Sequence, residues 1–329
     1  MNHMSSTAAI GKERAQRSVS FPAYIGLCLI WLGTVGLSIK ANNGVTTASI
    51  KLSATQLRLV DLAVAIPGLV IWAAILFAAL SIGRYARTIA GSKESPGFRY
   101  VAYGIFALLA GLVVNGYLGA LQQVISQHAT DPQKVKTTFV IISNYVSVVS
   151  ALITYGLVLQ GGRLLLRSIG ERLNLAKKLL PIVLAFIAIT VAYLWLIHSN
   201  PARQAVVDPG INPTFGLPYW LIVLTVALPF VVSWFVGVVA LIALYQYRQK
   251  TAGIVYKLLF KKLVIGMTLF IGLTILLQLL TQLYDLYAKS SLSFILGIIA
   301  LIYLILAYAF LLIAQGARKL NSVETFLIR

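Results

Sequence analysis

The stretch LVDLAVAIPGLVIW (Leu59–Trp72) is followed 162 residues later by LIVLTVALPFVVSW (Leu221–Trp234). The correspondence continues without a gap from Leu59–Gly104 to Leu221–Gly266, and it aligns residues that a merely apolar composition does not bring into register. The aligned pairs include Pro67 with Pro229, Trp72 with Trp234, Tyr85 with Tyr247, Phe98 with Phe260 and Gly104 with Gly266. Such an internal repeat predicts two copies of one structural unit.

The composition indicates a membrane protein. Hydrophobic residues make up 59% of the 329 residues and charged residues only 11%, whereas a soluble domain carries about 25% charged residues. The apolar residues are gathered in runs of roughly 20, the length of helix that crosses a hydrocarbon core about 30 Å thick. A transmembrane barrel is excluded, because it would show alternating segments of about ten residues. The predicted class is therefore all-α, with several transmembrane helices.

Eight spans are expected, and they divide the chain into two four-helix repeats. The spans cover residues 21–39, 59–90, 98–124, 138–160, 179–197, 219–252, 258–284 and 292–315. The fourth and eighth spans both end in Gln-Gly-x-Arg, at Gln160–Arg163 and Gln315–Arg318. The domains that follow are a polar tail (1–20), the first repeat (21–163), a basic linker (164–178), the second repeat (179–318) and a C-terminal tail (319–329).

The orientation follows from the basic residues in the connections. One side of the membrane receives 20 Lys and Arg residues and the other receives 7, and the side rich in basic residues is normally cytoplasmic. Both termini are therefore predicted to be cytoplasmic. Since each repeat has an even number of spans, the two halves share one orientation, and their pseudo-twofold axis is expected to run along the membrane normal.

The second and sixth spans are longer than a bilayer requires, so we expect them to project into the cytoplasm. Gly91 and Gly253 are predicted to end these helices in the left-handed conformation. Ser95 and Pro96 are then predicted to be the N-cap and the first residue of the next helix. Inside the spans, Pro67 and Pro229 are expected to kink their helices.

Polar residues on the later spans define a candidate site. Gln278, Gln282 and Asp285 share one face of a helix. Asn115 and Gln123 lie on the corresponding third span, with Asn144 on the fourth. Two interpretations remain open: a polar vestibule open to the outer side, or hydrogen bonds between helices, which are worth about 0.6 kcal/mol each.

The sequence indicates no catalytic residues and no cofactor or metal ligands. The three histidines are not placed mid-span, and zinc, serine-hydrolase and phosphate-loop motifs are absent. The net charge of +19 is distributed over the ends of the spans, so nucleic acid is not an expected partner. The basic segments 163–178 and 247–262 are instead expected to contact anionic headgroups.

The Pro-x4-Trp pattern of Pro67/Trp72 and Pro229/Trp234, in a four-span unit with a basic cytoplasmic end, resembles uncharacterised bacterial membrane domains of unknown function that occur in tandem. The resemblance implies a bacterial inner membrane and supplies no site residues. The leading functional hypothesis is a scaffold or subunit of a membrane or envelope assembly. The alternative is a channel or facilitator for a small solute through the polar vestibule.

Overall fold

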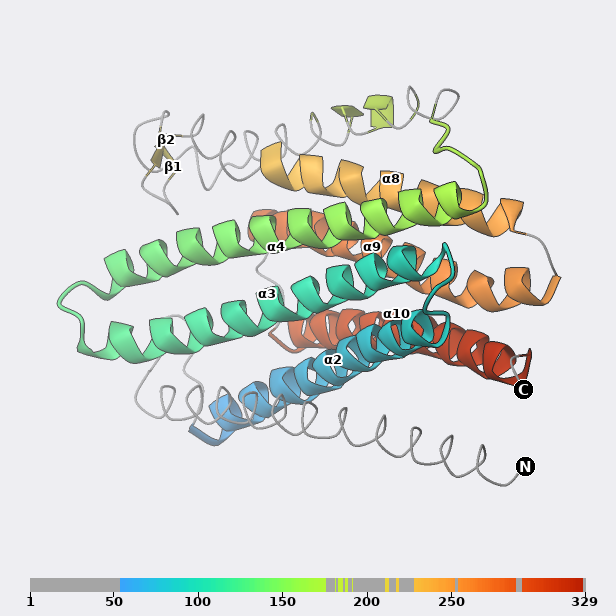
Figure 1. The fold of residues 1–329 in the computed structure, drawn as a ribbon. Helices are drawn as coiled ribbons and strands as arrows, with labels where there is room; N and C mark the ends of the chain where they lie inside the picture. The colour runs from blue at the N-terminus through green and yellow to red at the C-terminus, as the bar shows by residue number, and fades with distance from the viewer. Residues whose placement is uncertain are drawn as a thin grey trace.

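The computed structural model describes residues 54–175, 228–251, 254–287 and 292–327, together with residues 181, 183–185, 187–188, 191, 211–212 and 217–218. These residues form long helices that run side by side (Figure 1). The helices are α2 (Ala54–Thr88), α3 (Ser95–His128), α4 (Pro132–Ser168), α8 (Leu228–Lys250), α9 (Ile254–Tyr287) and α10 (Leu292–Leu327). Two short strands, β1 (Ile211–Asn212) and β2 (Leu217–Pro218), pair antiparallel.

The predicted all-α class is confirmed in the described part of the chain. Four segments are long and apolar enough to cross a bilayer: Gly68–Thr88, Ser95–His128, Ile141–Ser168 and Leu228–Lys250. The expected first span (21–39) and most of the fifth (179–197) lie outside the described residues, as does the N-terminal tail. The molecule is an α-helical membrane protein.

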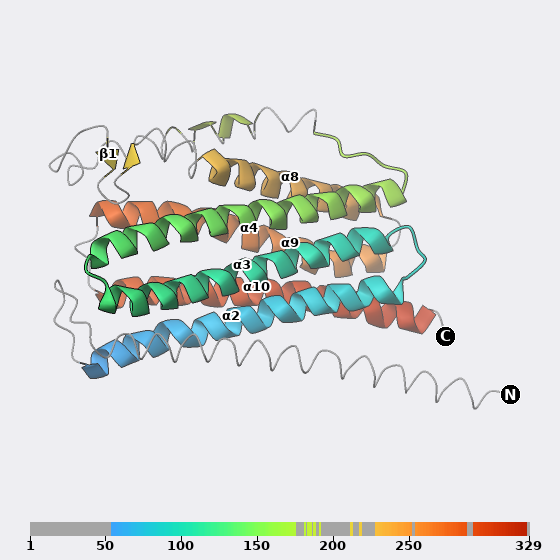
Figure 2. The same cartoon turned by 60° about the vertical axis from the view of Figure 1, so that its left-hand side comes forward.

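The six helices form a closed ring in chain order. Each helix packs against the next one along the chain, from α2 through α3, α4, α8 and α9 to α10, and α10 returns to α2. The two halves of the sequence therefore pack along two pairs of neighbouring helices, α4 with α8 and α10 with α2. Figure 2 shows the connection from α2 to α3 at the same end of the bundle as the C-terminal ends of α4 and α10.

Small residues allow adjacent helices to approach closely. A Cβ atom placed on Gly104 of α3 would lie 2.8 Å from the carbonyl oxygen of Thr154 on α4. Near the start of α3, Gly97 and Gly161 face each other so closely that a Cβ on either would meet the carbonyl oxygen of the other within 3.0 Å. Close backbone contact of this kind is how helices associate within a bilayer, where apolar side chains gain little by leaving lipid.

The ends of the helices partly follow the predictions. Gly91 has a φ of +98°, so the prediction of a left-handed glycine after α2 is confirmed, while Gly253 lies outside the described residues. The N-cap prediction is wrong by one residue: Glu94 occupies the cap position, and Ser95 is the first residue of α3. The Ser95 hydroxyl instead donates a 2.7 Å hydrogen bond to the carbonyl oxygen of Ala86 on α2.

The helix α4 continues beyond the expected end of the first repeat at residue 163. It ends at Ser168, and Gly170 follows with a φ of +78°. The amide of Glu171 donates to the carbonyl of Leu166 and that of Gly170 to Arg167, the pair of hydrogen bonds that defines a Schellman ending. The helix α4 therefore extends into the stretch that is expected to be the linker (164–178).

The segment after this ending lies along α8. Gln246 binds the backbone of Asn174 twice: its Nε2 donates to the carbonyl oxygen at 2.6 Å, and its Oε1 accepts from the amide at 3.1 Å. Glu171 and Lys250 add an exposed salt bridge of 3.0 Å. The start of the expected linker is thus held against the end of α8.

The two prolines fall at different places in their helices. The helix α2 is assigned without interruption through Pro67. Pro229 is the second residue of α8 as described, and the residues before Leu228 lie outside the description. Trp234 is buried and Trp72 packs against the core.

Candidate functional site

Basic residues gather at one end of the ring. Where α2, α4, α8 and α10 end and where α3 and α9 begin, the chain carries Arg84, Arg87, Arg99, Arg163, Arg167, Arg248, Lys250, Lys257, Lys261, Lys262, Arg318 and Lys319. The alternating direction of the helices brings these positions to a common end (Figure 2). We call this end of the bundle the basic end.

Four aromatic rings fill the centre of the ring near the basic end. Tyr85 and Phe98 meet edge to face with centroids 4.8 Å apart, and Tyr247 and Phe260 meet at 5.1 Å. The two pairs are joined by Phe98 and Phe260, whose centroids are 6.1 Å apart. All four side chains are buried. We call them the aromatic quartet.

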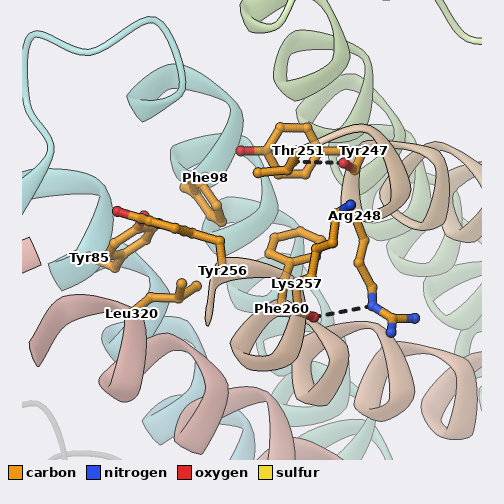
Figure 3. A pocket seen from close by; sticks show the side chains of 9 residues that line it. All are labelled: Tyr85, Phe98, Tyr247, Arg248, Thr251, Tyr256, Lys257, Phe260 and Leu320. Carbon is orange, nitrogen blue, oxygen red and sulfur yellow. Dashed lines mark hydrogen bonds between the residues drawn. The ribbon is translucent and has the colours of Figure 1, made fainter. Parts of the chain in front are cut away.

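A small hollow opens between the aromatic quartet and the ends of α8 and α9 (Figure 3). Its volume is about 240 Å³ with the open mouth included, but its enclosed part is only about 10 Å³, which is room for about one water molecule. Besides the quartet, it is lined by Arg248, Thr251, Tyr256, Lys257 and Leu320. Within the described residues this hollow combines aromatic walls with cationic side chains.

Hydrogen bonds fix the wall of the hollow. Nε of Arg248 donates to the carbonyl oxygen of Lys257 at 3.2 Å, so the end of α8 is tied to the first turn of α9. The Thr251 hydroxyl donates to the carbonyl oxygen of Tyr247 at 2.7 Å. The side chain of Glu94 lies near the Tyr247 hydroxyl.

The structure describes the side chains of only some residues of the predicted polar site. The side chains of Gln123, Gln278, Gln282 and Asp285 lie outside it, although their backbones belong to α3 and α9. Asn144 is half-buried on α4. Whether these residues form a vestibule stays a prediction.

Asn115 takes part in hydrogen bonds between helices. Its Nδ2 donates to the Ser147 hydroxyl on α4 at 2.8 Å, and its Oδ1 accepts from the Ser143 hydroxyl at 3.1 Å. The side chain thus links α3 to α4 by two hydrogen bonds. This is the interhelical role that the sequence left as one of two possibilities.

No metal site is evident among the described residues, where no three His, Cys, Asp or Glu side chains come together. No protein-family model, curated protein or solved structure matches the chain. This is consistent with the resemblance to membrane domains of unknown function, and no family is assigned.

The sequence analysis did not single out the hollow. Its residues belong to segments whose composition is that of any basic helix end. The repeat contained the signal, however, since Arg248 and Lys257 align with Ala86 and Ser95 of the first half. Two cations at positions where the other copy has small residues are a local difference that spacing and composition do not reveal.

Proposed function

We propose that the chain is an eight-span protein of the bacterial inner membrane, built from two parallel four-helix repeats (21–163 and 179–318) with both termini cytoplasmic. We further propose that it acts as a non-enzymatic scaffold or subunit of a membrane assembly. The basic end then faces the cytoplasm, in line with the excess of basic residues on that side.

Equivalent close contacts in the two halves support the repeat. Gly104 packs against Thr154 and Val158, with a Cβ expected 2.8 Å from the nearest atoms. Gly266 packs in the same way against Ala309 and Ile313, where a Cβ would lie 2.6 Å from Cγ1 of Ile313. Both pairs of partners are 155 residues apart, the same offset that relates Gln160 to Gln315. The aromatic quartet adds a second equivalence, since each half contributes one tyrosine–phenylalanine pair.

The observation that carries the scaffold proposal is the filled centre of the ring. The aromatic quartet occupies the axis at the basic end with buried rings. Farther along the bundle, Asn115 is engaged by two serines. A ring whose centre is filled by buried aromatic side chains at its basic end provides a rigid body with extended outer faces, which suits the assembly of other proteins better than passage of a solute.

Native mass spectrometry of the protein extracted gently from its own membrane tests this proposal. Recovery of the same protein subunits at fixed stoichiometry supports the scaffold function, provided that an unrelated multi-pass protein carrying the same tag does not recover them. A protein recovered alone that also conducts a solute in vesicles contradicts it. That result favours the alternative, a facilitator that uses the region of Asn144, Gln278, Gln282 and Asp285.

A further inference from the structure

The two repeats differ at one structurally equivalent place next to the aromatic quartet. In the first repeat this place is occupied by Ala86 and Ser95, whose side chains are 0% and 3% exposed. The Ser95 hydroxyl closes it by its 2.7 Å hydrogen bond to the Ala86 carbonyl. Ile89 and Leu165 complete the packing and are also buried. Neither of these two positions carries a cation in the first copy, and the neighbouring charged residue, Glu94, is acidic.

In the second repeat the same place is open and cationic. Arg248 stands at the position of Ala86, and Lys257 stands at the position of Ser95. Thr251 replaces Ile89, and Tyr256 replaces Glu94. A hydrogen bond again links the two key positions, now from Nε of Arg248 to the Lys257 carbonyl. This bond does not use the two terminal nitrogens of the guanidinium, and the Lys257 side chain is exposed.

The hollow opens at the C-terminal end of α8, a candidate membrane span, where the proposed orientation places the cytoplasmic headgroup region. Arg248 follows Leu244, a fully buried apolar residue of α8, by four residues, about 6 Å along the helix axis. On the outer face of α9, Leu258 is 60% exposed and Ile265 is 39% exposed. They are spaced i and i+7 on one face of α9, and the exposed Lys261 lies between them on the same face.

We propose that this hollow binds the phosphate group of an anionic membrane phospholipid, with Arg248 and Lys257 as the cationic ligands. Guanidinium and ammonium groups form the strongest hydrogen bonds to phosphate, and basic pockets between transmembrane helices on the cytoplasmic side are suited to anionic headgroups. The phosphate binds at the mouth of the hollow, where the Lys257 side chain is exposed. The inference rests on the orientation and repeat proposed above, but not on the scaffold function.

The test uses the full-length protein in detergent, titrated with phosphatidylglycerol or phosphatidylcholine and observed by native mass spectrometry. The variant R248A/K257S introduces the residues of the first repeat, which the same local fold already accommodates. We expect it to weaken phosphatidylglycerol binding by about tenfold or more, because two charge-assisted contacts are lost. The control R87A/R99A removes two exposed cations from the basic end outside the hollow, and it should change binding by less than about twofold.

Further arms separate the source of the phosphate from non-specific attraction. Inorganic phosphate is added at millimolar concentration to both proteins. If it displaces the lipid from the wild type but has no effect on R248A/K257S, the site is supported and its ligand is a soluble phosphate compound rather than a lipid. Equal binding of phosphatidylcholine and phosphatidylglycerol overturns the proposal, and so does equal loss in the two double variants. Thermal unfolding of both variants checks that they are folded, and the single variant K257S serves if R248A/K257S is not. The recovery of protein subunits is measured in a separate experiment. The comparison of lipid binding can therefore be interpreted even if the scaffold proposal fails.

Discussion

Phe98 and Phe260, which lie 162 residues apart in the sequence, meet edge to face at the centre of the helix ring, with centroids 6.1 Å apart and planes at 75°. Each ring also contacts a tyrosine of its own half, Tyr85 or Tyr247. The contact joins α3 to α9 across the ring. It is the place where corresponding positions of the two halves touch.

Replacing Phe98 or Phe260 with alanine should destabilise the bundle by about 3 kcal/mol each, because both rings are buried. The double variant should lose less than the sum, by about 1 kcal/mol of ring–ring coupling. Thermal unfolding in detergent measures all three. Tyr103, which lies on α3 with Phe98 and is 55% exposed, is the control, and Y103A should have little effect. Additive losses would mean that the two rings do not interact.

Alanine at Gly104 or Gly266 should weaken the bundle by about 1–3 kcal/mol, since the new methyl group would overlap the facing helix. The effects should be alike, because the two glycines make equivalent contacts. Gly119 on α3 has no atom within 4 Å of its expected Cβ, so G119A should be neutral or stabilising, given the higher helix propensity of alanine. A neutral G104A would contradict the close α3–α4 contact.

Leucine at Asn115 should cost about 1 kcal/mol of stability, corresponding to two interhelical hydrogen bonds. It should leave solute permeability of reconstituted vesicles unchanged, because the side chain is engaged between helices. N144L on the adjacent helix provides the comparison. Altered permeability in N115L alone would revive the vestibule interpretation for this residue.

Alanine at Gln246 should release the segment around Asn174, since both of its hydrogen bonds to the backbone disappear. Limited trypsin digestion reports this as faster cleavage after Arg172. Lys250→Ala removes only the exposed salt bridge to Glu171 and should have a much smaller effect, although it also removes one trypsin site. Q249A on the same helix end is the matched control. Equal cleavage in Q246A and Q249A would show that the segment is not held there.

The sequence predicted the helices well because apolar runs and their breaks are local signals. It placed Gly91 correctly, since the positive φ after a long helix has few other solutions. It did not predict that α4 continues to Ser168: the residues after Arg163 are basic, and their helix is held by packing of Leu165 and Leu166 rather than by membrane thickness. The closed order of the ring and the aromatic quartet depend on contacts between halves, which a repeat implies but does not specify.

The candidate site, like the fold, could be predicted from the sequence only in part. The polarity of Asn115 on an apolar helix was visible in the sequence, but its partners Ser143 and Ser147 are chosen by the α3–α4 contact. The cationic hollow needed both the repeat alignment and the geometry, because Arg248 and Lys257 resemble any other basic residues at a helix end.

Labelling of single cysteines with a membrane-impermeant maleimide tests the parallel repeat most directly. The only native cysteine, Cys28, is first replaced by serine, and cysteine is then introduced singly at the exposed positions Lys93, Gln249 and Thr130. Equivalent ends of two parallel repeats must lie on one side of the membrane. We expect Lys93→Cys and Gln249→Cys to react only in inside-out vesicles and Thr130→Cys only in intact spheroplasts. Labelling of Lys93→Cys and Gln249→Cys from opposite sides would contradict the proposed architecture.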